Sequence, residues 1–425
     1  MLQINTIREK KAEVIQRLLL KNFNQAPELI ESVLELDNRR KAIQKQGDDT
    51  KAEANTTARR IGELMRAGQK AEAEQLKAKT GELKNKEKEL DEQLRNVEEE
   101  IQTILLGIPN TPSLSVPPGH SAADNAVVLE SGKKPELPSN ALPHWELTSK
   151  YDIIDFELGV KLSGAGFPVY KGKGARLQRA LINFFLDRAT SAGYREIQPP
   201  IVVNEDSGYG TGQLPDKEGQ MYFVGEDNLY LIPTAEVPIT NIYRDVILKV
   251  EELPVKNCGY TPCFRREAGS YGKEVRGLNR LHQFDKVEIV QIAHPDSSYK
   301  ILEDMKDYVA SLLTELELPF RILKLCGGDM SFASALTYDL EVWSAAQQRW
   351  LEVSSVSNFE TFQTNRLKCR YRDEKGKTQL AHSLNGSALA LPRIVAALLE
   401  NNQNENGISI PKALVPYCGF ERIEA

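Results

Sequence analysis

The segment Cys263–Val290, CFRREAGSYGKEVRGLNRLHQFDKVEIV, carries cations, an aromatic ring and carboxylates on two strand-like stretches. Arg265 and Glu267 alternate in the first stretch, and Phe284 and Glu288 share the spacing of one strand face in the second. An arginine on a rigid strand can bind a phosphate through two parallel hydrogen bonds, and a phenylalanine ring can stack on a purine. The pattern suits a nucleotide, although polar side chains are also ordinary on the solvated face of an antiparallel hairpin.

Motifs of other nucleotide and metal sites are absent from the chain. In GFPVYKGKGAR, Gly174 stands where a phosphate-binding loop requires Ser or Thr. No GxGxxG motif opens a helix after a strand, and there is no HExxH, GxSxG or Cys/His cluster. The five cysteines form no CxxC pair, which indicates reduced thiols and no zinc site. A bound nucleotide is therefore expected to lie against side chains of a sheet.

The residues from about Trp145 onward contain both predicted helices and predicted strands, as an α+β domain does. GARLQRALINFFLDRATSAG and SALALPRIVAALLENNQ are predicted helices. Strand-like segments occur within YREIQPPIVV, LYLIPTAEVPITNIY, FRILKLCGG, TYDLEVWSAAQQRWLEVSSVSNF and the hairpin at Cys263–Val290. Several hairpins with few βαβ alternations predict an antiparallel sheet flanked by helices.

The N-terminal region predicts a long helical arm. Its second half repeats apolar residues with heptad spacing at Leu76, Leu83, Leu90, Leu94, Val97, Ile101 and Ile104. The first half continues in compatible phase from Leu29 to Leu64, and Gly68 can end one helix so that the chain reverses. We therefore expect an antiparallel coiled coil within a helical domain at 1–106. A Pro-, Gly- and Ser-rich linker at 107–144 and a catalytic domain at 145–425 would follow.

The composition is that of a soluble protein, with 41% hydrophobic and 27% charged residues and a net charge of −6. This charge argues against coating nucleic acid by bulk attraction, although it allows a local basic face. The N-terminus lacks the apolar core of a signal peptide, and no apolar stretch has membrane-spanning length. The sequence therefore predicts a cytoplasmic protein without membrane contact.

Three segments resemble the signature motifs of class II aminoacyl-tRNA synthetases, in the order in which that class has them. ALINFFLDRATSAGYREIQPP, ending at Pro200, is similar to motif 1, the Cys263–Val290 hairpin to motif 2, and LNGSALALPRIVAALLE with Arg393 to motif 3. Within the class, the chain resembles the seryl-tRNA synthetase family over nearly its whole length. The most specific segments are TAE at 234–236, FRREAGS at 264–270, HQFDKVE at 282–288, LEVSS at 351–355 and LNGSALA at 384–390. Arg266 and Pro392 depart from the residues frequent in the family.

The resemblance implies a set of site residues that no single position would indicate by itself. Arg265 is expected to hold the α-phosphate of ATP and the amino-acid carboxylate, and Arg393 the γ-phosphate, which makes these two the catalytic residues. The expected ATP-binding residues are Arg265, Arg266, Glu267, Phe284, Glu352, Val353, Ser354, Ser355 and Arg393. Mg²⁺ is expected to accompany ATP at Glu352 and Ser355, with no zinc. The expected serine-binding residues are Thr234, Ala235, Glu236, Arg265, Glu288, Asn385 and Ser387.

The resemblance also implies a reaction and its partners. ATP would activate L-serine to seryl-adenylate, and serine would pass to the 3′ end of tRNA(Ser); charging of tRNA(Sec) stays open. The 175–200 region would form a homodimer interface. The arm would contact tRNA, with Arg39, Arg40, Arg59 and Arg60 as candidates. Its charge alone favours a solvated coiled coil, because acidic residues are at least as numerous as basic ones.

Two other classes of function compete with this interpretation. A ligase that loads a carrier protein with an amino acid would be expected to lack the long arm. An inactive homologue that serves as a scaffold would be expected to have lost Arg265, Glu267, Glu352 or Arg393, and all four are present.

Overall fold

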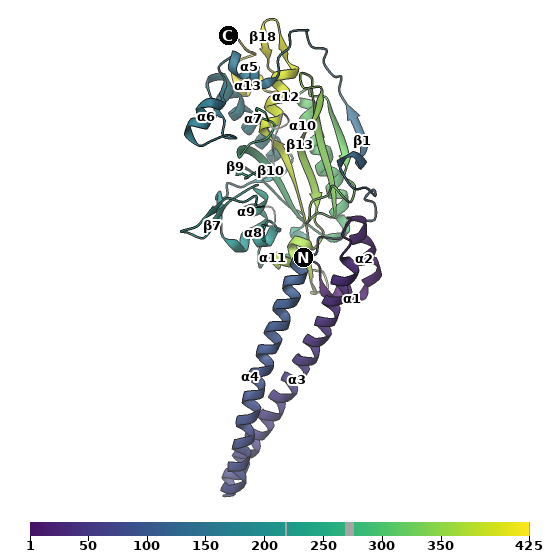
Figure 1. Cartoon of the computed structure of the whole chain (residues 1–425), viewed down its shortest axis with the longest axis vertical. Helices are drawn as coiled ribbons and strands as arrows, with labels where there is room; N and C mark the ends of the chain where they lie inside the picture. The colour runs from purple at the N-terminus through teal and green to yellow at the C-terminus, as the bar shows by residue number, and fades with distance from the viewer. Residues whose placement is uncertain (217–218, 268–275, 425) are drawn as a thin grey trace. The chain divides into compact units, whose positions relative to one another are not determined.

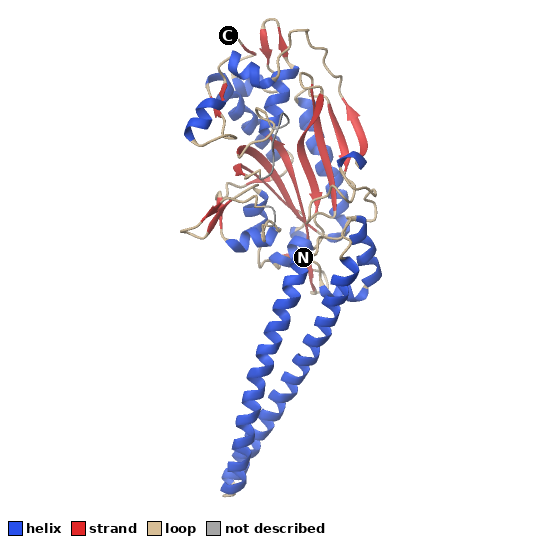
Figure 2. Ribbon diagram, viewed as in Figure 1, coloured by secondary structure: helices blue, strands red, loops and turns tan. Residues whose placement is uncertain are grey.

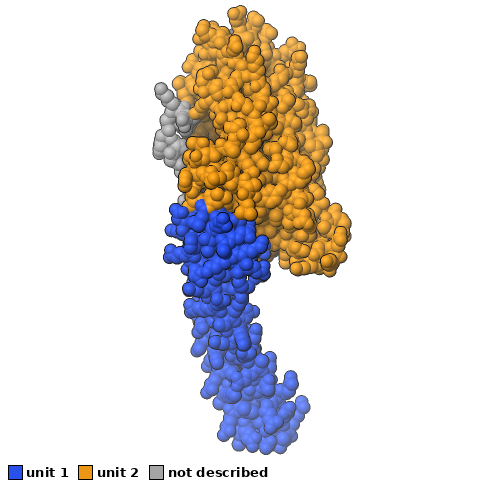
Figure 3. Space-filling view, turned by 90° about the vertical axis from the view of Figure 1, so that its right-hand side faces the viewer, with its two compact units in different colours: residues 1–19, 23–109 blue, residues 20–22, 110–425 orange. Residues whose placement is uncertain are grey.

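The computed structural model describes residues 1–216, 219–267 and 276–424 (Figure 1). Two compact units make up the chain, residues 1–19 with 23–109 and residues 20–22 with 110–425 (Figure 3). Among the described residues, no helix is both long and apolar enough to cross a membrane.

The first unit is helical and contains the predicted arm. Its helices are α1 (Ile4–Glu9), α2 (Lys11–Leu20), α3 (Ala26–Arg66) and α4 (Lys70–Gly107). The long helices α3 and α4 have 41 and 38 residues and pack against each other along the arm (Figure 2). Gly68 lies in the turn between them with φ of +80°, a conformation that glycine adopts without a steric cost. The predicted reversal at Gly68 is confirmed.

Most of the predicted heptad residues of α4 are buried between the two helices or partly buried there. Leu83, Leu90 and Val97 are buried. In the polar stretch of α3, Gly47, Thr50 and Thr57 are buried, and no apolar heptad position predicts them because they are small or polar. Such residues let the two helices stay in contact where no large apolar side chain is available.

The second unit is built on an eight-stranded sheet (Figure 2). All neighbouring pairs are antiparallel except β4 and β9, which are parallel. The strands, in spatial order, are β1 (Ala126–Ser131), β11 (Phe320–Lys324), β12 (Leu336–Ser344), β13 (Arg349–Asn358), β16 (His382–Ala390), β10 (Gln283–Ala293), β9 (Val255–Phe264) and β4 (Arg195–Glu196).

Helices cover both faces of this sheet. On one face, α7 (Gly172–Ser191), α10 (Ser298–Glu315) and α12 (Leu391–Asn401) form the main core with side chains such as Val287 and Ile289 of β10. On the other face, α9 (Glu236–Asn241) packs against Val290 of β10. Val287, Ile289 and Ala293 of β10 therefore enter the core, whereas the even-numbered residues alternate onto the side on which α9 lies.

Smaller elements complete the second unit. The helices are α5 (His144–Lys150), α6 (Phe156–Leu162), α8 (Glu205–Thr211), α11 (Phe362–Leu367) and α13 (Val415–Cys418), with short 3-10 turns η1 (Ala122–Asp124), η2 (Val250–Glu252) and η4 (Pro295–Ser297). The strands of the small sheets are β2 (Ile154–Asp155), β3 (Val169–Tyr170), β5 (Val202–Val203), β6 (Phe223–Val224), β7 (Leu229–Leu231), β8 (Ile247–Lys249), β14 (Arg370–Arg372), β15 (Thr378–Leu380), β17 (Gln403–Asn404), β18 (Gly407–Ser409) and β19 (Arg422–Ile423).

The α+β class with a predominantly antiparallel sheet is confirmed, but one segment prediction is wrong in part. LYLIPTAEVPITNIY carries the strand β7 as predicted, and its second half forms α9. In SALALPRIVAALLENNQ the first four residues, with Gly386 before them, belong to β16, and the helix begins at Leu391. Pro392 lies in the first turn of α12, where a missing N–H costs little. The segment assigned to a linker also contains β1, which pairs with β11 at the sheet edge.

Candidate active site

The predicted hairpin forms from β9 and β10, and it carries the candidate residues on one face. Phe284 lies opposite Cys263, and Glu288 lies opposite Gly259. Phe284, Lys286 and Glu288 share with Val290 the β10 face on which α9 lies, and Phe284 also packs at the edge of the main core. Residues 268–275, which include the end of the FRREAGS segment, lie outside the described residues.

Arg265 follows β9 directly and is held at both its backbone and its side chain. Its Nε donates to Pro233 O at 3.2 Å, and its guanidinium lies 5.2 Å from the centre of the Phe284 ring. Its backbone N–H donates to His282 O at 2.9 Å, and its carbonyl lies 3.0 Å from His282 Nδ1. The His282 ring stacks on Phe167 at 5.6 Å. The structure thus brings the predicted phosphate ligand and the predicted stacking ring together, with support from Phe167 that no sequence motif indicated.

Arg266 and Glu267 extend from the same end of β9. Arg266 is exposed; its Nε donates to Met221 O at 3.0 Å, and its guanidinium lies 4.7 Å from the Tyr222 ring centre. Glu267 has a φ of +48° and forms an ion pair with Arg280. The pair explains why an arginine accompanies the glutamate in the hairpin pattern, since each holds the other at the open end of the strands.

The predicted serine-binding residues converge at Glu288. Thr234 Oγ1 donates to Glu288 Oε2 at 3.1 Å, and Ser387 lies directly opposite Glu288 on β16. Lys286 Nζ lies 2.7 Å from the same oxygen, and the two side chains are only 6% and 3% exposed. Lys286 was not among the predicted site residues, although its position between Phe284 and Glu288 on one strand face could have indicated it.

Glu236 places a second carboxylate in this pocket. Burial, and next the nearby Glu288 carboxylate, raise the pKa of Glu236 to about 7. Gln363 Nε2 donates to Glu236 Oε1 at 2.6 Å, and Gln363 Oε1 accepts from Ser383 Oγ at 2.7 Å. Ala235 is fully buried beside these residues, so its side chain contributes packing. Gln363 comes from α11, far along the chain, and no local motif marked it.

Asn385 and Ser387 are also buried on β16. In the part of the chain that the structure describes, Asn385 Nδ2 is a buried donor without a hydrogen-bond partner. An unpaired buried donor costs free energy unless a ligand or water accepts from it. The Asn385 amide therefore suits a binding site better than a structural role.

A β-bulge brings Glu352 and Ser355 to one face of the sheet. Glu352 lies opposite Glu341 and Ser355 opposite Asp339, and the register shifts between them at Val353. Glu341 and Asp339 are two residues apart on β12, so their partners share a face even though they are three residues apart on β13. In a regular strand, residues three apart point to opposite faces, so the bulge is what places the two predicted Mg²⁺ ligands on one face.

The oxygen atoms near Ser355 fit a magnesium ion that arrives with ATP. Ser355 Oγ donates to Asp339 Oδ1 at 2.6 Å. Burial, and then Glu352, raise the pKa of Asp339 well above its ordinary value. Mg²⁺ prefers carboxylate and hydroxyl oxygens, and it commonly takes one or two protein carboxylates and completes its shell with phosphate and water. Asp339 was not among the predicted residues.

Arg393 is oriented by two backbone carbonyls. Its Nε donates to Asn279 O at 3.0 Å, and its Nη1 donates to Glu352 O at 2.8 Å. Val353 is only 1% exposed and packs in the main core, so only its backbone is available to a nucleotide. Ser354 Oγ donates to Ser387 O at 2.6 Å and thereby joins β13 to β16 beside the predicted serine-binding residues.

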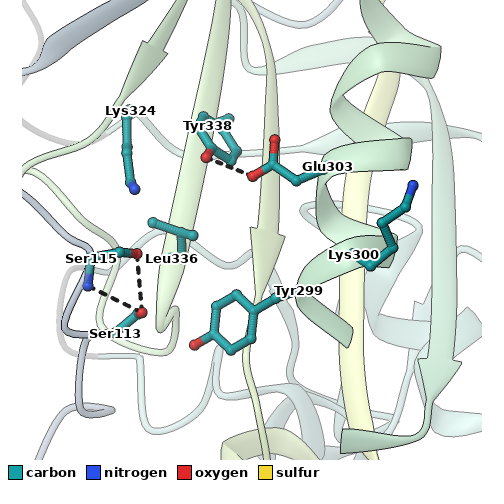
Figure 4. Close-up of a pocket in the computed structure, with 8 residues that line it drawn as sticks. All are labelled: Ser113, Ser115, Tyr299, Lys300, Glu303, Lys324, Leu336 and Tyr338. Carbon is teal, nitrogen blue, oxygen red and sulfur yellow. Dashed lines mark hydrogen bonds between the residues drawn. The ribbon is translucent and has the colours of Figure 1, made fainter. Parts of the chain in front are cut away.

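A cavity of about 460 Å³ lies elsewhere in the second unit, beside α10, β11 and β12 (Figure 4). Its lining includes Lys300, Lys324, Glu303 and Tyr338, none of which is a predicted site residue. Glu303 already accepts from Tyr338 at 2.7 Å, and Lys300 pairs with Asp304. The cavity therefore presents no converging set of groups for a phosphate, and the sheet face with Arg265 remains the candidate site.

The four candidate tRNA contacts on the arm differ in their environments. Arg39 and Arg59 are exposed, and Arg60, also exposed, pairs with Glu63 at 3.2 Å. Arg40 Nη2 instead lies 2.9 Å from the carboxylate of Asp37, which is fully buried. Arg40 therefore neutralises a buried charge of the arm, whereas the other three present their guanidinium groups to solvent.

Two regions of the chain match models of known protein families. The model of the "Seryl-tRNA synthetase N-terminal domain" family matches residues 1–112, and that of the "tRNA synthetase class II core domain (G, H, P, S and T)" matches residues 222–402. Serine--tRNA ligase of Salinibacter ruber is 51% identical, and that of Akkermansia muciniphila is 44% identical. The matches span 100% of this chain with 100% and 99% of those proteins.

Solved structures give the same result. The crystal structure of seryl-tRNA synthetase from Pyrococcus horikoshii complexed with ATP has a TM-score of 0.93 and 32% identity, covering 100% of this chain and 99% of that one. The cytoplasmic serine-tRNA ligase of Naegleria fowleri in complex with AMP has a TM-score of 0.87 at 26% identity, with the same coverage. On full-length identity, matched domains and shared fold, this chain belongs to the seryl-tRNA synthetase family of class II aminoacyl-tRNA synthetases.

Proposed function

We propose that this protein is a serine–tRNA ligase, which activates L-serine with ATP and transfers it to tRNA(Ser). Full-length relatives named serine--tRNA ligase support the activity. The observation that carries the proposal is the convergence of Arg265, Phe284 and Glu288 on one face of the β9–β10 hairpin. Such a face offers a phosphate ligand, a stacking ring and an acceptor for an ammonium group side by side.

In the first step, a serine carboxylate oxygen attacks the α-phosphorus of ATP. A new P–O bond forms, the bond to the β-phosphate oxygen breaks, and pyrophosphate leaves with the electron pair. Arg265 would bind the carboxylate and the α-phosphate, and Arg393 the γ-phosphate. Because negative charge collects on phosphate oxygens, fixed guanidinium groups lower the barrier by electrostatic stabilisation and alignment, and no nucleophilic side chain is needed.

The remaining residues position the substrates. Phe284 would stack on adenine, and Arg266 and Glu267 would lie along the nucleotide. Thr234 and Glu288 would receive the serine hydroxyl and ammonium groups, with Asn385 and Ser387 completing the pocket. Mg²⁺ at Glu352 and Ser355 would neutralise phosphate charge when it is bound with ATP. In the second step, the terminal ribose hydroxyl of tRNA attacks the carbonyl carbon of seryl-adenylate and releases AMP.

The test is ATP–pyrophosphate exchange measured with each of the twenty amino acids. Serine is expected to support strong exchange that requires Mg²⁺. Alanine should fail, since a pocket built to hydrogen-bond a hydroxyl leaves buried groups unpaired when that hydroxyl is missing. Strong exchange with alanine or proline and none with serine would refute the assignment.

We propose further that residues 1–106 bind tRNA, that 107–144 form a linker and that 145–425 carry the chemistry. The exposed guanidinium groups of Arg39, Arg59 and Arg60 on the arm support a phosphate contact. Charging assays with transcripts of tRNA(Ser) and tRNA(Sec) would decide whether both are substrates.

A homodimer through the 175–200 region is also proposed. The edge strand β4 in this region has both residues exposed, which leaves room for a second copy. Light scattering at micromolar concentration should give the mass of two chains; a fully active monomer would contradict the proposal. The predicted cytoplasmic location can be checked by cell fractionation.

A further inference from the structure

A buried histidine–glutamate pair lies outside the residues assigned to either substrate. His144 of α5 and Glu400 of α12 are both fully buried, and His144 Nδ1 lies 2.7 Å from Glu400 Oε1. The same carboxylate accepts from the His144 backbone N–H at 3.0 Å, from Gln347 Nε2 at 3.0 Å and from Ser344 Oγ. Burial opposes ionisation of Glu400, but these hydrogen bonds outweigh it and keep the pKa of Glu400 below its ordinary value. The Glu400 carboxylate is therefore buried and accepts from His144, Gln347 and Ser344.

The other ring nitrogen of His144 reaches the segment that leads into β10. His144 Nε2 accepts the backbone N–H of Leu278 at 2.8 Å, so the proton of the imidazole lies on Nδ1, toward Glu400. Gly277 has a φ of +68°, and a Cβ there would lie 2.3 Å from His144 Nε2. The His144 ring therefore packs directly against the backbone at Gly277 and Leu278 and leaves no room for a side chain at position 277.

The next residue along this segment connects the pair to Arg393. Asn279 Nδ2 donates to Gln347 Oε1 at 2.9 Å, and Gln347 in turn donates to Glu400. The Asn279 carbonyl is the acceptor for Arg393 Nε at 3.0 Å. Both Glu400 and Arg393 belong to α12. The network therefore closes a loop in which the backbone that orients Arg393 is itself fixed by His144 and Gln347.

We infer that His144 is a positioning residue for the binding of the ATP γ-phosphate. It acts through Leu278 and Asn279, whose carbonyl sets the direction of the Arg393 guanidinium. The inference rests on the proposed function, in which Arg393 binds that phosphate. A guanidinium that must meet a phosphate with two parallel hydrogen bonds loses affinity when its own support shifts.

The variants distinguish an effect on the orientation of Arg393 from a general loss of folding stability. His144→Phe keeps the ring volume and removes both hydrogen-bonding nitrogens, whereas His144→Gln retains one donor and one acceptor. Gln347→Leu breaks the second support, at a partly exposed position. The control is His382→Phe, since His382 is also a buried histidine, bonded to Ser298 Oγ at 2.8 Å at the start of β16, and has no contact with Arg393.

Binding of ATP and of AMP to the full-length protein is measured by titration calorimetry, alongside thermal melting. His144→Phe is expected to weaken ATP binding about tenfold, the scale on which losing a supporting hydrogen bond behind a ligand group acts. AMP binding should change by less than about twofold, because AMP lacks the phosphate that Arg393 would hold. His144→Gln should recover most of the ATP affinity, and Gln347→Leu should weaken ATP binding more mildly. His382→Phe should lower the melting temperature and leave the ratio of the ATP affinity to the AMP affinity unchanged.

Two outcomes would overturn the inference. One is an unchanged ATP affinity in folded His144→Phe, or in Gln347→Leu if the first variant does not fold. The other is an equal loss of ATP and AMP binding, which would indicate a structural role only. Direct nucleotide titration does not depend on which amino acid is activated, so absence of serine-dependent exchange in the wild type would refute the proposed function separately.

Discussion

Replacement of Lys286 by methionine tests the charge balance of the proposed serine pocket. Lys286 and Glu288 lie 2.7 Å apart with almost no exposure, and Glu236 brings a second carboxylate to the pocket. At an effective dielectric constant of about 20, the attraction at this distance is about 6 kcal/mol, and desolvation of both groups offsets much of it. Removing one partner of a buried pair costs about 3–5 kcal/mol, because the other charge stays buried without compensation.

We expect Lys286→Met to lower both stability and serine recognition. The KM for serine should rise about 10- to 100-fold, because Glu288 is no longer held in place to receive the ammonium group. This fold-change corresponds to the free energy of one hydrogen bond to a charged group. The KM for ATP should rise less. Urea unfolding and serine-dependent pyrophosphate exchange are measured on the same preparation, with Lys256→Met on β9 as the control.

A double variant shows whether the two effects share one cause. Adding Glu288→Gln to Lys286→Met removes the uncompensated buried charge, so part of the stability should return, whereas serine exchange should stay low. A folded Lys286→Met protein whose KM for serine stays within about twofold of the wild type would refute this account of the pocket. Recovery of exchange in the double variant would refute it as well.

The remaining predictions concern the pocket, the hairpin and the arm. Since the pKa of Glu236 is raised to about 7, its carboxyl is neutral below that pH and ionised above it; kcat/KM for serine should rise through about pH 7 and lose this rise in Glu236→Gln. Between about pH 4.5 and 7 the folded state binds the extra proton, so this group's contribution to stability falls as pH rises, which urea titrations at several pH values would measure. Arg265→Ala should lose about 3 kcal/mol or more of transition-state stabilisation with the fold intact by circular dichroism; near-wild-type exchange would disprove the phosphate role. Deleting 31–103, with a short turn in its place, should leave exchange nearly unchanged and remove most tRNA charging. Arg59→Ala with Arg60→Ala should reduce charging more mildly, and increasingly so with added salt; equal loss of both activities would mean that the arm supports the active site.

Local periodicity in the sequence was enough to predict the arm and the central hairpin. Heptad spacing at Leu83, Leu90 and Val97 depends only on neighbouring turns of one helix, and Gly68 marks the reversal by its own backbone freedom. Likewise, the two-residue period of a strand places Phe284 and Glu288 on one face wherever the strand lies. The segments with a local conflict were less predictable: α9 and the start of motif 3 contain apolar runs that fit either a strand or a helix.

Non-local pairing decided the rest of the candidate site. The bulge at Val353 that brings Glu352 and Ser355 to one face exists only relative to β12, and so no period within β13 could reveal it. The raised pKa of Glu236, on α9, requires burial beside Glu288 of β10, and the contact between His144 and Leu278 joins segments far apart in the chain. Residue types and short spacings are properties of the sequence alone, whereas burial, charge compensation and the direction of a side chain arise only when distant segments pack together.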